Sequence, residues 1–277
     1  MQKIIIEAGG KNTRYFRDLW NYRTLAFNFA KRDITVRYKQ TAIGIGWALI
    51  GPLLNMAVMS FIFGKLAGLP ADGGAPYSIM VYSGLIAWNL FARTLTVSAA
   101  TFSSNADLMK KVYFPRLAAP LGQTAAILAD SLISLLLLFL LYAITGYKPP
   151  YSRLIFCLPA LLLPFLLGFF AGIFLAPSTI RRRDLNHALP FLLQVGQYLS
   201  PVVYSFSLIS TGFSGKAFWL YTLNPMTGAI NTFKWCLIGD LDFHLPSFLI
   251  SLAWIGLLIP LGLSRFRKAE KDFVDLV

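Results

Sequence analysis

Amide and phenol side chains recur on one face of a predicted helix over residues 188–206. Gln194, Gln197, Tyr198 and Pro201 follow one another at i, i+3, i+4 and i+7, and Tyr204 lies beyond them. Because amides that face lipid are costly, we expect this stripe to face protein or a wet cavity. Amides and aromatic rings offer shallow, repeated contacts of the kind that suit a sliding polysaccharide. The alternative is hydrogen bonding that only joins helices to one another.

Weaker stripes of the same kind lie in two earlier apolar segments. In segment 47–64, Asn55, Met59 and Phe63 recur at helical spacing. Segment 77–99 carries Trp88 beside Asn89. Together the three segments predict the residues that line a passage: Asn55, Met59, Phe63, Trp88, Gln194, Gln197, Tyr198 and Tyr204.

Two charges lie inside apolar segments. Arg93 is in segment 77–99 and Asp130 is in segment 119–145, and consecutive membrane helices run antiparallel. A charge buried in a membrane protein usually finds a partner, so we predict an ion pair between the two side chains. A channel-facing role for either residue, or an Arg93 side chain that reaches toward the interface, remains an alternative.

The connection 103–118 mixes cations with aromatic rings. Lys110, Lys111 and Arg116 flank Tyr113 and Phe114. A short helix with an aromatic knob can fit a groove on a partner protein while its cations contact acidic rims. A basic loop that is merely held on the cytoplasmic side by its charge would account for the cations but not for the rings. We therefore predict that a partner protein docks here.

The sequence lacks the motifs of an enzyme. No G-x-x-x-x-G-K-[S/T] phosphate loop occurs, so ATP is not expected to bind by that route. His187 and His244 lie in separate connections, and Cys157 and Cys236 do not have zinc spacing, which argues against a metal site. With no catalytic constellation, we predict a passage without a metal or cofactor of its own.

Composition places the chain in a membrane. Of its 277 residues, 56% are hydrophobic and only 13% are charged, whereas soluble domains are about 25% charged. A net charge of +13 would suggest nucleic acid in a soluble protein, but here the cations lie between apolar runs, so no nucleic-acid partner is expected. No internal boundary is visible, and we expect one domain over residues 1–277.

Six segments reach the length of a membrane-spanning helix, which is about 20 mostly apolar residues. They are Trp47–Gly64, Tyr77–Ala99, Ala119–Thr145, Leu154–Ala176, Ala188–Phe206 and Ser247–Leu263. Lys and Arg concentrate in residues 1–46, 100–118, 177–187 and 264–277, whereas the external connections hold only Lys65, Lys148, Arg153, Lys216 and Lys234. This bias predicts that both termini are cytoplasmic. The expected fold is all-α: a cytoplasmic segment 1–46, a six-helix membrane domain 47–263 and a cytoplasmic tail 264–277.

Helices outside the spans are also expected. Tyr15, Leu19, Tyr22, Ala26 and Phe29 form one apolar face of an amphipathic helix, which suits a membrane interface or, alternatively, a partner protein. Before the last span, two short aromatic helices are predicted, Lys216–Leu223 and Pro225–Ile238, with Asn224-Pro225 as the start of the second. These two helices either re-enter the outer leaflet or form an external cap.

Motifs along nearly the whole chain resemble the membrane subunits of ABC-type polysaccharide exporters, most closely the O-antigen branch. They are Arg37-Tyr38-Lys39-Gln40-Thr41 with Gly44, Trp47-Ala48, Pro52-Leu53, Gly84-Leu85-Ile86-Ala87-Trp88, Leu108-Met109-Lys110-Lys111-Val112-Tyr113-Phe114-Pro115-Arg116, Arg183-Asp184, Ser200-Pro201-Val202-Val203-Tyr204, Asn224-Pro225-Met226, and Phe266 with Glu270, Phe273 and Asp275. In one departure, Arg181-Arg182-Arg183-Asp184 is more basic than the family's aromatic-Arg-Asp pattern.

The resemblance implies a channel-forming permease that moves lipid-linked polysaccharide across the bacterial inner membrane. It implies a homodimer that binds two copies of a separate ATP-hydrolysing subunit, which would hold the ATP and Mg. The amphipathic helix would be the interface helix and the two short helices the gating helices. Contact with the ATPase would fall on Leu108, Lys110, Lys111, Tyr113, Phe114, Arg116, Arg182, Arg183 and Asp184. A drug or lipid permease is the nearest alternative, and a membrane-embedded lipid-linked transferase is a more distant one.

Overall fold

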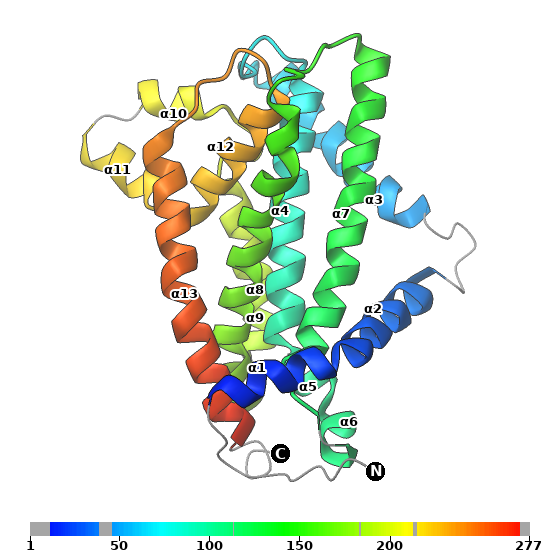
Figure 1. Ribbon diagram of the computed structural model, residues 1–277. Coiled ribbons are helices and arrows are strands. Elements are labelled where there is room, and N and C mark those ends of the chain that lie inside the picture. Colours follow the sequence, from blue (N-terminus) through cyan, green and yellow to red (C-terminus); the bar gives the residue numbers. More distant parts are fainter. Residues whose placement is uncertain (1–11, 39–45, 113, 183, 213–214, 272–277) are drawn as a thin grey trace.

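A computed structural model of the chain describes residues 12–38, 46–112, 114–182, 184–212 and 215–271, and every regular element in these ranges is a helix. Four long helices form an upright bundle (Figure 1): α4 (Tyr77–Ala99), α7 (Ala118–Thr145), α8 (Cys157–Arg181) and α13 (Leu245–Lys271). Helix α8 packs between α4 and α13, while α7 packs on the other side of α4. Helix α4 is therefore covered by neighbours over most of its length.

Glycines allow the two central helices to approach each other closely. A Cβ added at Gly168 of α8 would lie 2.5 Å from the backbone oxygen of Phe91, and one added at Gly172 would lie 2.7 Å from that of Leu95. Without a hydrophobic driving force between membrane helices, such small-residue contacts supply the van der Waals packing that holds them together. Because α4 is held this close to α8, the face of α4 that points away from α8 also has a fixed position.

Shorter helices occupy the two ends of the bundle. At the end where α13 finishes lie α1 (Asn12–Asn21), α5 (Thr101–Ser104) and α6 (Ala106–Lys111), and α2 (Arg23–Tyr38) continues from α1 against α7. At the other end lie α10 (Phe206–Gly212), α11 (Lys216–Thr222) and α12 (Pro225–Leu237), with a single turn of 3₁₀ helix, η2 (Leu154–Phe156), leading into α8. On the outside are α3 (Gly46–Met59), the π-helical η1 (Ser60–Leu66) and α9 (Asp184–Tyr198).

Three helices in the described part of the chain are long and apolar enough to cross a membrane by length and composition. They cover Ala118–Thr145, Leu154–Arg181 and Leu245–Lys271, and a shorter apolar helix covers Ile50–Leu66. The predicted spans over 119–145, 154–176 and 247–263 thus correspond to α7, α8 and α13. The second predicted span has the same bounds as α4, Tyr77–Ala99. That all six segments cross a membrane stays a prediction.

The fifth predicted segment differs from the structure. We expected a helix over 188–206, but α9 begins at Asp184 and ends at Tyr198. Beyond it the chain turns, with the N–H of Val202 bonded to the carbonyl of Ser200 at 2.7 Å. Pro201 has no N–H to continue the helical hydrogen bonds, which accounts for the early end. Pro201 and Tyr204 therefore do not share a helix face with Gln194.

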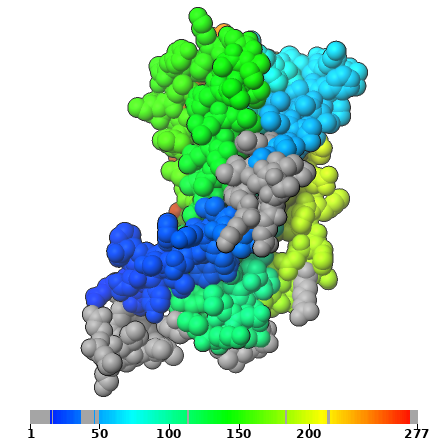
Figure 2. Space-filling model, turned by 90° about the vertical axis from the view of Figure 1, so that its right-hand side faces the viewer, coloured from blue at the N-terminus to red at the C-terminus, as the bar shows by residue number. Residues whose placement is uncertain are grey.

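The N-terminal amphipathic helix also differs in part. It consists of two helices, α1 and α2, rather than one. Its predicted apolar face does not face outward: Phe29 is buried, and Tyr15, Leu19, Tyr22 and Ala26 pack around the same core at the end of the bundle. Figure 2 shows this pair lying across the surface beside α5 and α6. The face is apolar because α7 and its neighbours cover it, and that the helix pair lies at the membrane interface stays a prediction. Other side chains, Trp20, Phe27 and Val36, are the exposed apolar ones.

The start of α12 agrees with the sequence. The Asn224 side chain accepts a hydrogen bond from the N–H of Met226 at 3.0 Å, and Pro225 is the first helical residue, so the predicted cap is confirmed. Helix α12 is almost completely buried against α4, α8 and α13. Helix α11 instead exposes Trp219, Leu220 and neighbouring Leu223. Whether these helices lie at the depth of the membrane stays a prediction.

Candidate functional site

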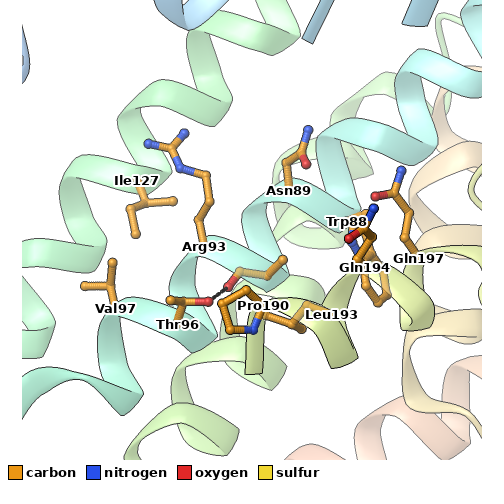
Figure 3. Close-up of a pocket in the computed structure, with 11 residues that line it drawn as sticks. Trp88, Asn89, Arg93, Thr96, Val97, Ile127, Pro190, Leu193, Gln194 and Gln197 are labelled. Atoms are coloured by element: carbon orange, nitrogen blue, oxygen red, sulfur yellow. Dashed lines mark hydrogen bonds between the residues drawn. The ribbon is translucent and has the colours of Figure 1, made fainter. Parts of the chain in front are cut away.

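A groove of about 360 Å³ lies between α4, α7 and α9. Its walls carry one indole ring, three amides, one guanidinium and one hydroxyl among aliphatic side chains (Figure 3). Helix α4 contributes Trp88, Asn89, Ala92, Arg93, Thr96 and Val97, helix α7 contributes Ile127, and helix α9 contributes Pro190, Leu193, Gln194 and Gln197. The groove thus brings together Trp88, Gln194 and Gln197, which the sequence predicted as passage-lining residues on separate segments.

Trp88 is packed into the wall of the groove and is only 4% exposed. Its ring lies against α9 at Gly196, where an added Cβ would be 3.0 Å from the indole, and its centroid is 5.3 Å from that of Phe91. A side chain at position 196 would push the indole away from α9. The glycine therefore sets the distance between the two walls, which the sequence analysis did not anticipate.

The three amides of the groove carry unused hydrogen-bonding capacity. Asn89 and Gln197 are half-buried and Gln194 is exposed. Within the described ranges no protein partner bonds to Asn89, Gln194 or Gln197, whereas the Thr96 hydroxyl donates to the carbonyl of Ala92 at 2.8 Å. Each primary amide offers two donors and an acceptor. The amides do not join helices to one another, so they are open to water or to a ligand.

Arg93 and Asp130 meet across α4 and α7. The Arg93 Nη2 donates to Asp130 Oδ2 at 2.7 Å. The Arg93 side chain is 44% exposed and lines the groove, while that of Asp130 is 5% exposed. The predicted ion pair is thus present in the structure, and a channel-facing role for Arg93 stays a prediction.

The remaining predicted passage residues lie outside this groove. Asn55 of α3 is exposed, and Met59 and Phe63 pack against the bundle core. Tyr198 ends α9, and its carbonyl accepts a hydrogen bond from the Tyr204 hydroxyl at 3.0 Å. Tyr221 donates in turn to the Tyr204 hydroxyl at 3.0 Å. Through these two hydrogen bonds Tyr204 connects the end of α9 to α11.

In the connection between α4 and α7, the cations and the ring have opposite environments. Lys110 and Lys111 are exposed and Leu108 is half-buried. Phe114 is only 3% exposed, and its ring centroid lies 6.0 Å from that of Phe29 on α2. The prediction that Phe114 is an exposed aromatic knob is wrong, because its ring is buried in the core beneath the loop. Tyr113 lies outside the described residues.

Arg116 is fixed to the end of α13. Its backbone N–H donates to Glu270 Oε1 at 2.9 Å, and its Nη1 donates to the Glu270 carbonyl at 2.6 Å. Arg267 lies over the Tyr15 ring, 4.6 Å from its centroid. Burial, and then the charge of nearby Glu270, raise the pKa of the Tyr15 phenol above its ordinary value. This cluster joins the loop, α1 and α13, a contact that the sequence analysis did not predict.

In the connection between α8 and α9, Arg182 and Asp184 are exposed and Arg183 lies outside the described residues. In the ranges that the structure covers, no group of three or more His, Cys, Asp or Glu residues is placed to hold a metal ion. Cys157 and Cys236 are buried free thiols.

Sequence analysis missed a buried lysine at the opposite end of the bundle. We counted Lys234 among the external loop cations, yet its side chain is fully buried and its Nζ donates to the carbonyls of Pro201 at 2.6 Å and Tyr204 at 3.4 Å. Asp72, also buried, accepts hydrogen bonds from Ser205 and Ser207 and acts electrostatically on Lys234. The position of Lys234 between Phe233 and Trp235, inside a helix with apolar residues on all sides, was the signal available in the sequence.

Known proteins resemble the chain over most of its length. Residues 24–238 match the family described as ABC-2 type transporter. Two proteins of Klebsiella pneumoniae called O-antigen export system permease protein RfbA are 27% and 26% identical over 249 residues, which are 89% of this chain and 92% of each relative. A protein of the same name from Myxococcus xanthus is 27% identical over 222 residues, 80% of this chain and 83% of the relative. With its apolar helices, its lack of strands in the described ranges and this match, the chain is a multi-pass membrane protein that belongs to the ABC-2 type transporter family.

Proposed function

We propose that the chain is the channel-forming permease subunit of an ATP-driven exporter that moves lipid-linked, O-antigen-like polysaccharide across the bacterial inner membrane. The observation that carries this proposal is the similarity to O-antigen export permeases over 89% of the chain and 92% of the relative. A match of that coverage aligns the groove, both ends of the bundle and the connections, rather than a single shared element.

The groove supports sugar as the substrate class. Three amides without protein partners in the described ranges can bond to sugar hydroxyls. Each such contact is weak, and a conducting path needs sites that release what they bind. A path for a greasy drug would have no use for the amides and the guanidinium that stand here among six apolar side chains.

The membrane arrangement that we propose has six spans and both termini in the cytoplasm. Helices α7, α8 and α13 supply three spans, and α4, with α3–η1 and α9, would supply the others. Helix α4 is less apolar because it is enclosed: Ser83, Thr94 and Ser98 are all buried inside the bundle. The concentration of Lys and Arg near α1, α6 and the end of α13 supports a cytoplasmic location for that end.

The proposed assembly is a homodimer with two ATP-binding subunits. The exposed Lys110, Lys111 and Val112 on and after α6, with Arg182 and Asp184, would contact the ATP-binding subunit, which would carry the ATP and Mg. Phe114 would support this surface from beneath instead of inserting into the partner. The polar groups of the groove, open on one side, would be enclosed by the second copy of the chain.

Deletion of the gene in its own host tests the proposal. Polysaccharide should then accumulate inside the cell and disappear from the surface, and the plasmid-borne chain should restore it only when the ATP-binding subunit is also present. The alternative permease for a drug or lipid predicts unchanged surface polysaccharide and altered drug resistance or membrane lipid. Normal surface polysaccharide in the deletion strain would contradict the proposal.

A further inference from the structure

We propose that the groove between α4 and α9 binds a phosphate group of the exported lipid-linked glycan, with Arg93 as the principal ligand; this rests on the proposed function. The groove then has two parts, a phosphate subsite at Arg93 and the amides of Gln194 and Gln197, which can bond to sugar hydroxyls. The argument starts from the orientation of the Arg93–Asp130 pair.

The pair presents its positive end to the groove. Asp130 is 5% exposed and lies behind Arg93, whose side chain is 44% exposed and lines the groove. A guanidinium has five N–H donors, and the hydrogen bond between the two side chains uses only Nη2. Asp130 therefore orients the fork without occupying all of it.

Further donors surround the same space. Asn89 precedes Arg93 by one helical turn on α4, and Gln194 and Gln197 face the groove from α9 (Figure 3). None of the three has a protein partner in the described ranges, and no Asp or Glu is among the groove-lining residues. The groove thus offers many donors and one cation, with no competing negative charge on its surface.

The shape of the ion favours phosphate over a carboxylate. A carboxylate is planar and is satisfied by a single bidentate fork, part of which Asp130 already takes. A phosphate is tetrahedral and carries several acceptor oxygens, so it can bond to Arg93 and still accept from a second donor such as Asn89, one turn away on α4. Its charge would also be balanced by the guanidinium in a setting where an unpaired anion is costly.

The test measures binding of radiolabelled glucose 1-phosphate and of radiolabelled glucose to the purified full chain in phosphatidylcholine nanodiscs. Wild-type chain should bind the phosphorylated sugar at least tenfold more tightly than glucose. Arg93→Gln should weaken glucose 1-phosphate binding about tenfold or more, since it removes a charge-assisted hydrogen bond, and leave glucose binding unchanged. Equal affinity of wild-type chain for the two sugars would overturn the proposal.

Asp130→Asn separates a phosphate site from a purely structural pair. If the pair only holds the helices together, Asp130→Asn and Arg93→Gln should impair the chain alike. If Arg93 binds phosphate, Asp130→Asn should retain or strengthen binding, because the guanidinium keeps its charge and gains a free donor. Arg93→Gln combined with Asp130→Asn leaves no unpaired buried charge, so a folded double variant that still binds phosphate as tightly as wild type would also overturn the proposal.

Arg32→Gln is the matched control. Arg32 on α2 is also paired with an aspartate, Asp33, at 2.9 Å, and its side chain is 49% exposed, but it lies outside the groove. Its replacement should leave phosphate binding unchanged. A loss equal to that of Arg93→Gln would show that the chain attracts phosphate through its general positive charge and would refute the groove as the site.

Two further comparisons separate the possible sources of phosphate and the two proposals. If phosphatidylglycerol in the nanodisc displaces glucose 1-phosphate, the subsite takes a lipid headgroup, and the assignment to the glycan fails. If no displacement occurs, the assignment to the glycan holds. The binding experiment in nanodiscs is independent of the deletion experiment. If the chain binds phosphate but the deletion strain keeps normal surface polysaccharide, the proposed function is refuted. If the deletion strain loses its surface polysaccharide but the chain does not bind phosphate, only the phosphate subsite is refuted.

Discussion

Arg116 and Glu270 are joined by two hydrogen bonds although 154 positions separate them. The Arg116 N–H donates to the Glu270 carboxylate at 2.9 Å, and its guanidinium donates to the Glu270 carbonyl at 2.6 Å. The first residue lies between α6 and α7 and the second in the last turn of α13. The loop between α6 and α7 and the end of the last long helix are therefore held as one unit.

Glu270→Ala should destabilise this unit by about 1–3 kcal/mol, because it leaves the Arg116 N–H without its acceptor. Glu270→Gln keeps an acceptor oxygen and should lose less. The midpoint of thermal unfolding in detergent measures both, with Lys271→Ala, an exposed neighbour, as the control. Equal midpoints for Glu270→Ala and Lys271→Ala would mean that the contact contributes nothing.

Phe114→Ala should act on stability and not directly on partner binding. The ring is buried against Phe29, and truncation of a buried Phe typically costs about 3–5 kcal/mol. Phe114→Leu fills most of the space and should cost less. Thermal unfolding gives the order wild type, Leu, Ala. A fully stable Phe114→Ala variant that fails to bind the ATP-binding subunit would restore the exposed-knob interpretation.

Reversal of the charges of the α6 cations should act on partner binding and not on stability. Lys110 and Lys111 are exposed, so Lys110→Glu with Lys111→Glu should leave the unfolding midpoint within error and reduce co-purification of the ATP-binding subunit several-fold. Lys148→Glu, an exposed lysine at the opposite end of the bundle, is the control. Wild-type yield of partner with the double variant would exclude this surface.

Lys234→Met should destabilise the other end of the bundle. It removes the donor to the carbonyls of Pro201 and Tyr204, and a buried acceptor left unsatisfied typically costs about 1–3 kcal/mol. It also removes the favourable charge of Lys234 from the neighbourhood of the buried Asp72. Asp72→Asn in the Lys234→Met background removes the unpaired charge and should recover part of the loss. If the double variant loses as much unfolding free energy as the two single variants lose together, the two charges act independently.

The sequence predicts helices best where they are long and bounded by clear signals. Helix α4 follows Pro76 and has the predicted bounds, and α12 begins at the predicted cap of Asn224 and Pro225. The end of α9 was missed because the polar spacing of Gln194, Gln197 and Pro201 continues past the point where Pro201 stops the helix. Spacing shows which residues would share a face if the helix continued, but not whether it does.

Environment was harder to predict than secondary structure. Phe114 and Lys234 were both assigned by residue type, one as an exposed ring and one as an external cation, and both are buried. Their burial depends on α2 and on the turn after α9, which are remote in sequence. The groove, by contrast, was partly foreseen, because amides and a tryptophan on apolar helices must face something other than lipid.

The rate of thiol modification in the groove during export tests the central claim most directly. In a chain with Cys157→Ala and Cys236→Ser, single cysteines replace Gln194 and Gln197 of the groove, or Phe191 and Leu199, which are also exposed but lie outside the groove lining. A membrane-impermeant polar thiol reagent reacts with thiols that meet water, so it separates a wet path from a lipid-facing surface. If polysaccharide passes through the groove, the cysteines at 194 and 197 should react faster than those at 191 and 199, and faster still while ATP is hydrolysed. Equal rates at all four positions throughout active export would contradict the account.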